Sequence, residues 1–251
     1  MGLATLVSLA ASASALGTID NLRHLVDSPV WVFHGRADTT VKKPASDAGV
    51  QWYRHFGADV RYNNNTLANH AWVSPLGANQ CAVSASPYTA NCESDPQRAM
   101  LTHLLRRPVQ APNRAGLTGR LTPFSQERFT RAKWGLPAYM LSMDDTGYVY
   151  APPQCATGEV TCDVMVVLHG CEQAASIIGL DLVQQANINE YADSNNFIVL
   201  YPQTIALSLG VVLNPKACWD WWGYLAGDAM YAVHGSYQME VLMAIIASLR
   251  M

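Results

Sequence analysis

The chain has 251 residues and a net charge of -3, and charged residues make up only 14% of it. This length allows one α/β domain with a sizeable core, and the near balance of acids and bases argues against nucleic acid as a partner. The longest uncharged apolar run, 2–17, is interrupted by serine and threonine. It is shorter than the roughly 20 residues of a spanning helix, so we expect no membrane segment.

Residues 1–18 predict either a signal peptide or a short remnant helix. Leu3 to Ala11 is an apolar stretch, and Ala13-Ser14-Ala15 has the A-x-A form of a cleavage site. No lysine or arginine precedes Arg23, so the charged start of a signal is missing. The alternatives stay open, and we expect 19–251 to form a single domain.

Three short apolar runs have the length and β-branched content of buried strands. They are Val30–Phe33, Val164–Leu168 and Phe197–Tyr201, and helical patterns cover 177–192 and 237–249. Alternation of strand and helix predicts a mostly parallel sheet with helices on both faces. Ligands of such sheets bind at the carboxyl ends of strands, so the residues after each run are candidate site residues.

The range 106–135 is expected to connect one half, 19–105, to a second half, 136–251. It carries many arginines, a single acid, Glu127, and several prolines and glycines. This composition is typical of a solvated connection, and a basic binding patch is the alternative interpretation.

Asp38 follows the first predicted strand, and His70 comes 32 residues later in Asn69-His70-Ala71-Trp72. This order is typical of the acid and base of a hydrolase triad, in which the carboxylate fixes the imidazole tautomer and stabilises the imidazolium. A turn aspartate and a surface histidine are the plainer interpretation of the same two residues.

The second predicted strand runs into His169-Gly170-Cys171. In α/β-hydrolases a backbone N–H of such a loop helps to form the oxyanion hole, and the Cys171 amide is the candidate donor. The alternative is that Cys171 is itself the nucleophile of a Cys-His-Asp triad with His70 and Asp38.

Six cysteines, with no C-x-x-C pair and no zinc-site spacing, favour disulfides in an oxidising compartment. Six cysteines allow 15 connectivities, so any pairing is a choice. Short loops favour the first two bridges and elimination gives the third: Cys81–Cys92, Cys155–Cys162 and Cys171–Cys218.

The third bridge would join the candidate oxyanion turn to Cys218-Trp219-Asp220-Trp221-Trp222. Trp219 and Trp221 in this aromatic cluster are either core residues or the lining of a cleft for an apolar ester or polymer.

A serine elbow, G-x-S-x-G, does not occur in the chain. The nearest match, 206–210, contains Ser208 but follows no second predicted strand. The candidate acid and histidine also precede the candidate oxyanion loop, which is the order that a circular permutation gives. In a permuted chain the nucleophile would lie upstream of Asp38.

Several segments together resemble the circularly permuted, fungal-type poly(3-hydroxybutyrate) depolymerases. They are Val32–Val41, Cys81–Cys92 with Ser86-Pro87-Tyr88, Met143–Tyr148, Leu168–Gln173, Tyr201–Gln203, Asn214-Pro215 and Cys218–Trp221. The resemblance implies an α/β-hydrolase fold, secretion, and polyester cleavage through an acyl-enzyme without cofactor or metal. It also implies that Asp38 is the acid, His70 the base, Cys171 an oxyanion donor and Trp219 a cleft aromatic.

The family's serine elbow would precede residue 1, so we expect either an N-terminally incomplete chain or a homologue that has lost catalysis. The first hypothesis is a Ser-His-Asp hydrolase of hydroxyalkanoate polyester or its oligomers, inactive without its serine. The second is a secreted, non-catalytic protein that binds the polymer through Trp219 to Trp222. A polyester or small ester is the expected partner, and the protein is expected to be a monomer.

Overall fold

A computed structural model of the chain describes residues 2–209, 212–225, 227 and 230–249. The chain divides into two compact units, Met1–Val109 and Gln110–Met251. Within the described ranges, no helix combines the length and the apolar character that crossing a membrane requires.

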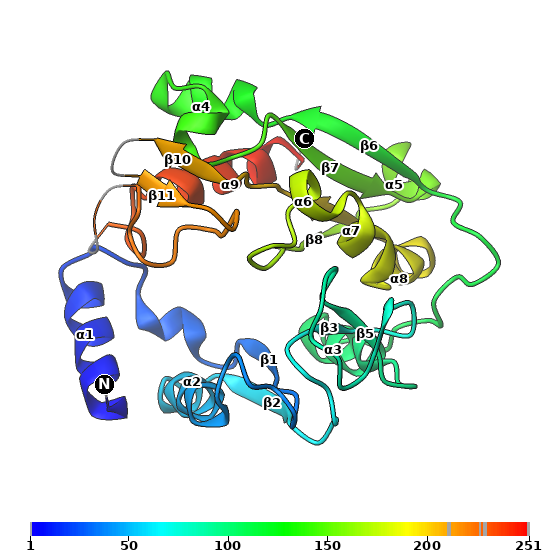
Figure 1. The fold of residues 1–251 in the computed structure, drawn as a ribbon, viewed down its shortest axis with the longest axis horizontal. Coiled ribbons are helices and arrows are strands. Elements are labelled where there is room, and N and C mark those ends of the chain that lie inside the picture. The colour runs from blue at the N-terminus through cyan, green and yellow to red at the C-terminus, as the bar shows by residue number, and fades with distance from the viewer. Residues whose placement is uncertain (1, 210–211, 226, 228–229, 250–251) are drawn as a thin grey trace. The chain divides into compact units, whose positions relative to one another are not determined.

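The first unit is built around a parallel pair of strands (Figure 1). Strand β1 (Pro29–Phe33) pairs with β2 (Asp59–Asn63), and helix α2 (Lys43–His55) is the crossover between them. A crossover is required because parallel strands cannot be joined by a tight turn. Helix α1 (Leu3–Ala15) lies where a signal peptide or a remnant helix was expected. It contacts α2 but has no buried residue, and a 3-10 helix, η1 (Leu22–Leu25), follows it.

The rest of the first unit is a small parallel sheet and one helix. Its strands, in the order β3-β5-β4, are β3 (Trp72–Val73), β5 (Thr89–Asn91) and β4 (Asn79–Gln80), and helix α3 (Pro96–Leu104) follows. His103 of α3 is buried, and its Nε2 lies 2.9 Å from the carbonyl oxygen of Asp59 and 3.2 Å from that of Val30. This histidine therefore joins α3 to both strands of the central pair.

The second unit contains a four-stranded sheet in the order β6-β7-β9-β8. The strands are β6 (Arg120–Ser125), β7 (Thr146–Ala151), β9 (Phe197–Tyr201) and β8 (Asp163–Val166). The predicted α/β class is confirmed. Strands β8 and β9 are parallel, as expected, whereas β7 runs antiparallel to both of its neighbours, so this sheet is mixed.

The predicted strands and the last predicted helix lie close to the observed ones. Strand β9 has the expected bounds, β1 begins one residue earlier, and helix α9 (Tyr237–Ser248) ends one residue before the expected position. Buried residues of α9 and β9 form the core of the second unit with a neighbouring segment: Val241, Ile245, Leu200, Ala138, Leu141 and Met143.

The single helix predicted over 177–192 is wrong, because the segment forms three short helices. They are α6 (Ala175–Ile178), α7 (Asp181–Gln185) and α8 (Asn189–Asn195). Gly179 ends α6 with φ of 62°, and Asn187 precedes α8 with φ of 59°. A left-handed backbone cannot continue a right-handed helix, so these two residues divide the segment.

The range 106–135, expected as a connection, contains β6 and helix α4 (Glu127–Trp134), with Gln126 buried between them.

The remaining elements of the second unit are short: the 3-10 helix η2 (Ala138–Leu141), α5 (Pro153–Ala156), β10 (Leu207–Leu209) and β11 (Val212–Asn214). Ser208 lies on β10, which pairs antiparallel with β11. This serine is therefore part of a hairpin and not of a strand-to-helix elbow.

Candidate functional site

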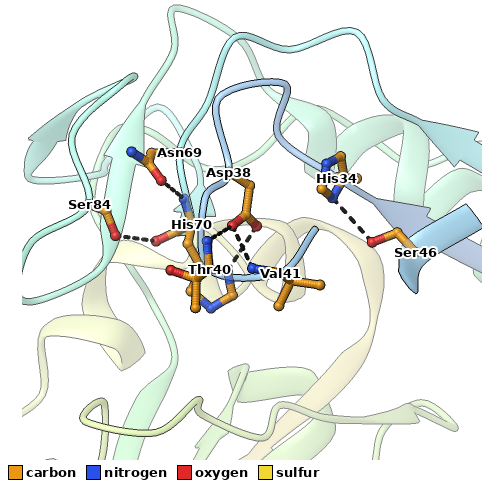
Figure 2. A network of polar contacts seen from close by, with 8 residues as sticks. All are labelled: His34, Asp38, Thr40, Val41, Ser46, Asn69, His70 and Ser84. Carbon is orange, nitrogen blue, oxygen red and sulfur yellow. Dashed lines mark hydrogen bonds and ion pairs between the residues drawn. The ribbon is translucent and has the colours of Figure 1, made fainter. Parts of the chain in front are cut away.

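The loops that follow β1 and β2 bring Asp38 and His70 into contact (Figure 2). Nδ1 of His70 lies 2.9 Å from Oδ2 of Asp38. The other carboxylate oxygen accepts hydrogen bonds from the N–H groups of Thr40, at 2.8 Å, and Val41, at 2.9 Å. An ionised carboxylate can only accept hydrogen bonds, so a neutral His70 carries its proton on Nδ1 and its lone pair on Nε2.

Backbone hydrogen bonds hold these two loops together beyond the ends of the strands. The Arg36 N–H donates to the Thr66 carbonyl at 2.8 Å. The Ala37 N–H donates to the Ala68 carbonyl at 2.9 Å. A Cβ atom on Gly35 would lie 2.3 Å from the carbonyl oxygen of Ala68. Glycine at position 35 is therefore what allows the two loops to approach closely.

The backbone of His70 is fixed on both sides. Its N–H donates to Oδ1 of Asn69 at 2.7 Å, and its carbonyl accepts from Oγ of Ser84 at 3.4 Å (Figure 2). The Asn69 N–H in turn donates to the carbonyl of Cys81, which is bonded to Cys92. The disulfide therefore lies in the segment that positions the histidine.

The two members of the pair differ in exposure. The Asp38 side chain is 8% exposed and the His70 side chain is 46% exposed. Burial raises the pKa of Asp38, but hydrogen bonds from His70 and from the amides of Val41 and Thr40 outweigh it, so this pKa lies below its usual value. Nε2 of His70 has no hydrogen-bond partner in the described part of the chain. The arrangement is an oriented imidazole with an open lone pair, which can act as a general base.

In the second unit, the loop after β8 holds the peptide group between Gly170 and Cys171 in one orientation. The Gly170 carbonyl lies 2.8 Å from Nδ1 of His169 and accepts from the Gln173 N–H at 3.2 Å. The Gly170 N–H donates to Oε1 of Gln173 at 2.9 Å. Because a trans peptide is planar, the Cys171 N–H points away from the bound carbonyl. It donates to no residue among those described.

His169 is buried, and both of its ring nitrogens have hydrogen-bond partners. It is 4% exposed, and its Nε2 accepts a hydrogen bond from the Thr204 N–H at 3.1 Å. A backbone N–H can only donate, so the His169 proton resides on Nδ1 and is donated to the Gly170 carbonyl. Burial lowers the pKa of His169 and outweighs the opposing hydrogen bond to Gly170, so the neutral ring is favoured. Sequence patterns gave no sign of this link, because Thr204 is 35 residues away.

All six cysteines form disulfides, in the pairing expected from the sequence: Cys81–Cys92, Cys155–Cys162 and Cys171–Cys218. Cys171 therefore has no free thiol, and the alternative of a Cys-His-Asp triad is wrong. The third bridge joins the loop at Cys171 to the tryptophan segment that begins at Cys218.

The two candidate substrate tryptophans have different surroundings. Trp219 packs against the core of the second unit, and its ring centroid lies 5.5 Å from that of His169. Its indole N–H is buried and has no hydrogen-bond partner among the described residues. Trp221 is 64% exposed and meets the Trp222 ring edge-on at 5.0 Å. Asp220, between them, accepts hydrogen bonds from the amides that follow and so fixes the turn.

The described residues contain no group of three or more histidine, cysteine, aspartate or glutamate side chains placed to hold a metal ion. Two buried glutamines, Gln126 and Gln203, to which the sequence assigned no role, fix the ends of strands in the second unit. Nε2 of Gln126 donates to the Gln203 carbonyl at 2.8 Å, and Oε1 of Gln203 accepts from the Ala175 N–H at 2.8 Å. Their partners are distant in sequence, so no local pattern could have indicated them.

The relatives and solved structures described next are all polyhydroxybutyrate depolymerases. No family model matches the sequence. A poly(3-hydroxybutyrate) depolymerase of Delftia acidovorans is 35% identical over 246 residues, which are 96% of this chain and 46% of the relative. A polyhydroxybutyrate depolymerase of Talaromyces funiculosus is 34% identical over 223 residues, 84% of this chain and 63% of the relative. The chain therefore spans less than two thirds of either curated relative.

Two solved structures match with a TM-score of 0.85 and 31% identity, each over 99% of this chain and 77% of the solved chain. One is the PHB depolymerase from Penicillium funiculosum. The other is a serine-to-alanine variant of a PHB depolymerase complexed with an R3HB trimer. By these likenesses in sequence and structure, the chain belongs to the poly(3-hydroxybutyrate) depolymerase family and has its α/β-hydrolase fold.

Proposed function

We propose that this protein hydrolyses the ester bonds of poly(3-hydroxybutyrate) or its oligomers. The observation that carries the proposal is the hydrogen bond of 2.9 Å between Asp38 and His70, which leaves Nε2 of the imidazole open. An imidazole oriented in this way removes the proton of a serine hydroxyl as that hydroxyl attacks an ester carbonyl. The substrate class follows from the relatives, one of which was solved with an R3HB trimer.

In the proposed reaction a serine oxygen bonds to the ester carbonyl carbon while Nε2 of His70 takes the serine proton. Collapse of the tetrahedral intermediate breaks the ester C–O bond, and the alcohol end leaves with the proton from His70. A water molecule, deprotonated by the same nitrogen, then releases the acid from the acyl-enzyme. Asp38 stays ionised throughout and stabilises the imidazolium, which its lowered pKa supports.

The Cys171 amide is the proposed oxyanion donor. Its N–H has no described partner, while the carbonyl of the same peptide group is hydrogen-bonded to His169 and Gln173. A donor that is already oriented requires no reorganisation when charge develops, and loss of one such donor lowers the rate by about 100- to 1000-fold in serine hydrolases.

The proposed contact with the polymer is made by Trp219 and Trp221. The exposed ring of Trp221 offers apolar area to a polyester surface, and the buried indole N–H of Trp219 lacks a partner among the described residues. We also propose that the protein acts outside the cell, because its three disulfides are typical of secreted proteins.

Release of 3-hydroxybutyrate from the R3HB trimer tests the proposed hydrolysis. Because the 251 residues contain no G-x-S-x-G sequence, the assay uses the protein expressed from its gene, which is expected to release product, whereas its His70→Gln variant is expected to release almost none. His55→Gln, an exposed histidine of the same unit, is the matched control and should retain the wild-type rate. Equal rates in wild type and His70→Gln would contradict the proposal.

A second candidate function is polymer binding without cleavage. The lack of a G-x-S-x-G sequence and the exposure of Trp221 favour it. Sedimentation with polyhydroxybutyrate granules separates the two functions. Binding that is lost in Trp221→Ala, with no product released by wild type, would support the second candidate and contradict the first.

A further inference from the structure

A pocket of about 340 Å³ lies beside Asp38 in the first unit. This volume is in the range of pockets that bind small molecules. Its lining comes from the loop after β1, the start of α2 and the loop after β2: His34, Arg36, Asp38, Lys43, Asn64 and Asn65. The proposed reaction uses only one of these residues, so the others require another explanation.

Most of the lining side chains offer N–H donors. The Arg36 side chain is exposed and forms no ion pair or hydrogen bond with a described residue. His34 is 4% exposed, and its Nδ1 lies 3.1 Å from Oγ of Ser46 on α2 (Figure 2). Nε2 of His34 has no described partner. Helix α2 begins at this pocket without a capping side chain, so the positive end of its dipole adds to the donors.

Of the two cationic side chains that line the pocket, Arg36 and Lys43, only Arg36 has no ion-pair partner among the described residues. Nζ of Lys43 lies 2.7 Å from Oδ1 of Asp47, which also accepts a hydrogen bond from the Tyr62 hydroxyl at 3.0 Å. The Asp38 carboxylate is 8% exposed and already accepts from three donors. Arg36 is therefore the positive group that remains available to a ligand.

We propose that this pocket binds the free carboxylate end of a hydroxyalkanoate oligomer, with Arg36 as its principal contact. This inference rests on the proposed function, because each cut in a polyester creates a new carboxylate end. A guanidinium group donates two parallel N–H bonds to a carboxylate, whereas an ester group lacks the charge that this pairing requires. The pocket therefore selects oligomers with a free acid end over their esters.

Calorimetric titration of the full chain with the R3HB trimer, as free acid and as methyl ester, tests the inference. The His70→Gln background prevents turnover of either ligand. The acid is expected to bind at least about tenfold more tightly than the ester, a difference of about 1.4 kcal/mol. Arg36→Gln is expected to abolish the difference, and Arg36→Lys, which keeps the charge without the paired donors, to retain part of it.

Arg54→Gln is the matched control, since Arg54 is an exposed arginine of α2 outside the pocket lining. It should leave the acid-to-ester ratio unchanged. Equal affinities of acid and ester, or a ratio that Arg36→Gln does not alter, would overturn the inference. Displacement of the acid by an equal concentration of inorganic phosphate would also overturn it, because the pocket would then be a general anion site.

The two proposals fail in different ways, because titration measures binding without turnover. A chain that prefers the acid through Arg36 but releases no product from the trimer contradicts only the proposed hydrolysis. A chain that hydrolyses the trimer but binds acid and ester equally contradicts only the carboxylate pocket.

Discussion

His70 in the first unit and His169 in the second are both oriented through Nδ1, but their second nitrogens meet different surroundings. His70 is paired with a carboxylate, is 46% exposed and leaves Nε2 open. His169 is 4% exposed, and its Nε2 accepts from the Thr204 N–H. The group that faces the second nitrogen therefore decides what each ring can do: an open Nε2 beside a carboxylate can take up a proton, whereas an Nε2 that already accepts a hydrogen bond holds its ring in place.

The difference extends to the charge that each histidine can carry. Protonation of His70 places a cation beside the ionised Asp38, which stabilises it. Protonation of His169 would put an unpaired cation in a buried site and place a second proton on the nitrogen that faces the Thr204 N–H. The first histidine is therefore suited to moving protons, and the second to holding the Gly170 carbonyl in place.

The largest effect is expected when the carboxylate partner of His70 is removed. Asp38→Asn offers the ring an N–H in place of an acceptor, which favours the wrong tautomer, and kcat on the R3HB trimer should fall by about 10⁴. Asp27→Asn is the control, because Asp27 is an exposed carboxylate of the same unit at a positive φ that asparagine also adopts. A fall of less than tenfold in Asp38→Asn would contradict the role given to Asp38 in orienting His70.

The disulfide between Cys171 and Cys218 is expected to contribute more to stability than the disulfide that closes a shorter loop in the same unit. The Cys171–Cys218 bridge joins residues 47 apart, and Cys155–Cys162 joins residues 7 apart. From loop length, paired replacement by alanine should lower the free energy of unfolding by about 4 kcal/mol for the first and about 2 kcal/mol for the second. Denaturant unfolding of the two double variants measures this, and equal losses would contradict the expectation.

The close approach of the loops in the first unit is tested by Gly35→Ala. The new methyl group would meet the Ala68 carbonyl, so we expect a loss of about 1–3 kcal/mol in the free energy of unfolding. Gly49→Ala is the matched control, since it lies within α2 and has no atom within 4 Å of an added Cβ. It should stabilise the protein by about 0.5–1 kcal/mol. A loss of the same size in both variants would refute the role given to Gly35.

The smallest effect is a difference in acid sensitivity between the two sites. Unfolding exposes His169, which then takes up a proton near the ordinary histidine pKa of 6.5, whereas the buried ring stays neutral to lower pH. The unfolded state thus binds more protons than the folded state below about pH 6.5. As the pH is lowered through this range, the free energy of unfolding decreases by at most about 1.4 kcal/mol per pH unit. His169→Asn should remove this slope and His55→Gln should keep it, as measured by unfolding between pH 8 and pH 5.

Asp38 loses its contribution in a more acidic window. Its pKa is lowered from 3.8 in the folded chain, so the unfolded state protonates first as pH falls below 3.8. The stability that Asp38 provides is therefore complete at neutral pH and is lost only below about pH 4. A slope between pH 6.5 and pH 5 that Asp38→Asn removes would contradict this assignment.

Features that leave a local pattern, or a recognisable order of residues along the chain, could be predicted from the sequence. The apolar run 197–201 gives β9 its bounds, and the position of Asp38 after a strand, with a histidine downstream, predicts the contact with His70. The cysteine pairing follows from short loops and elimination, because only one pair then remains. These predictions succeed because the deciding interactions lie close in sequence or leave few alternatives.

Other features depend on tertiary contacts and left no local signal. The 177–192 pattern is apolar enough for one helix, but the left-handed residues Gly179 and Asn187 divide it. The antiparallel strand β7 was missed, and its register depends on neighbours at 120–125 and 199–201. Thr204 and Gln203 fix the strand ends from a distance, so their roles emerge only once the chain is folded.

The proposed function requires that His70, oriented by Asp38, activates a serine. Labelling of the protein expressed from its gene with a fluorophosphonate, followed by peptide mass spectrometry, tests it most directly. We expect an adduct on one serine in wild type and in His55→Gln, and none in His70→Gln. No adduct in wild type, or an adduct that forms equally in His70→Gln, would contradict the proposed role of His70.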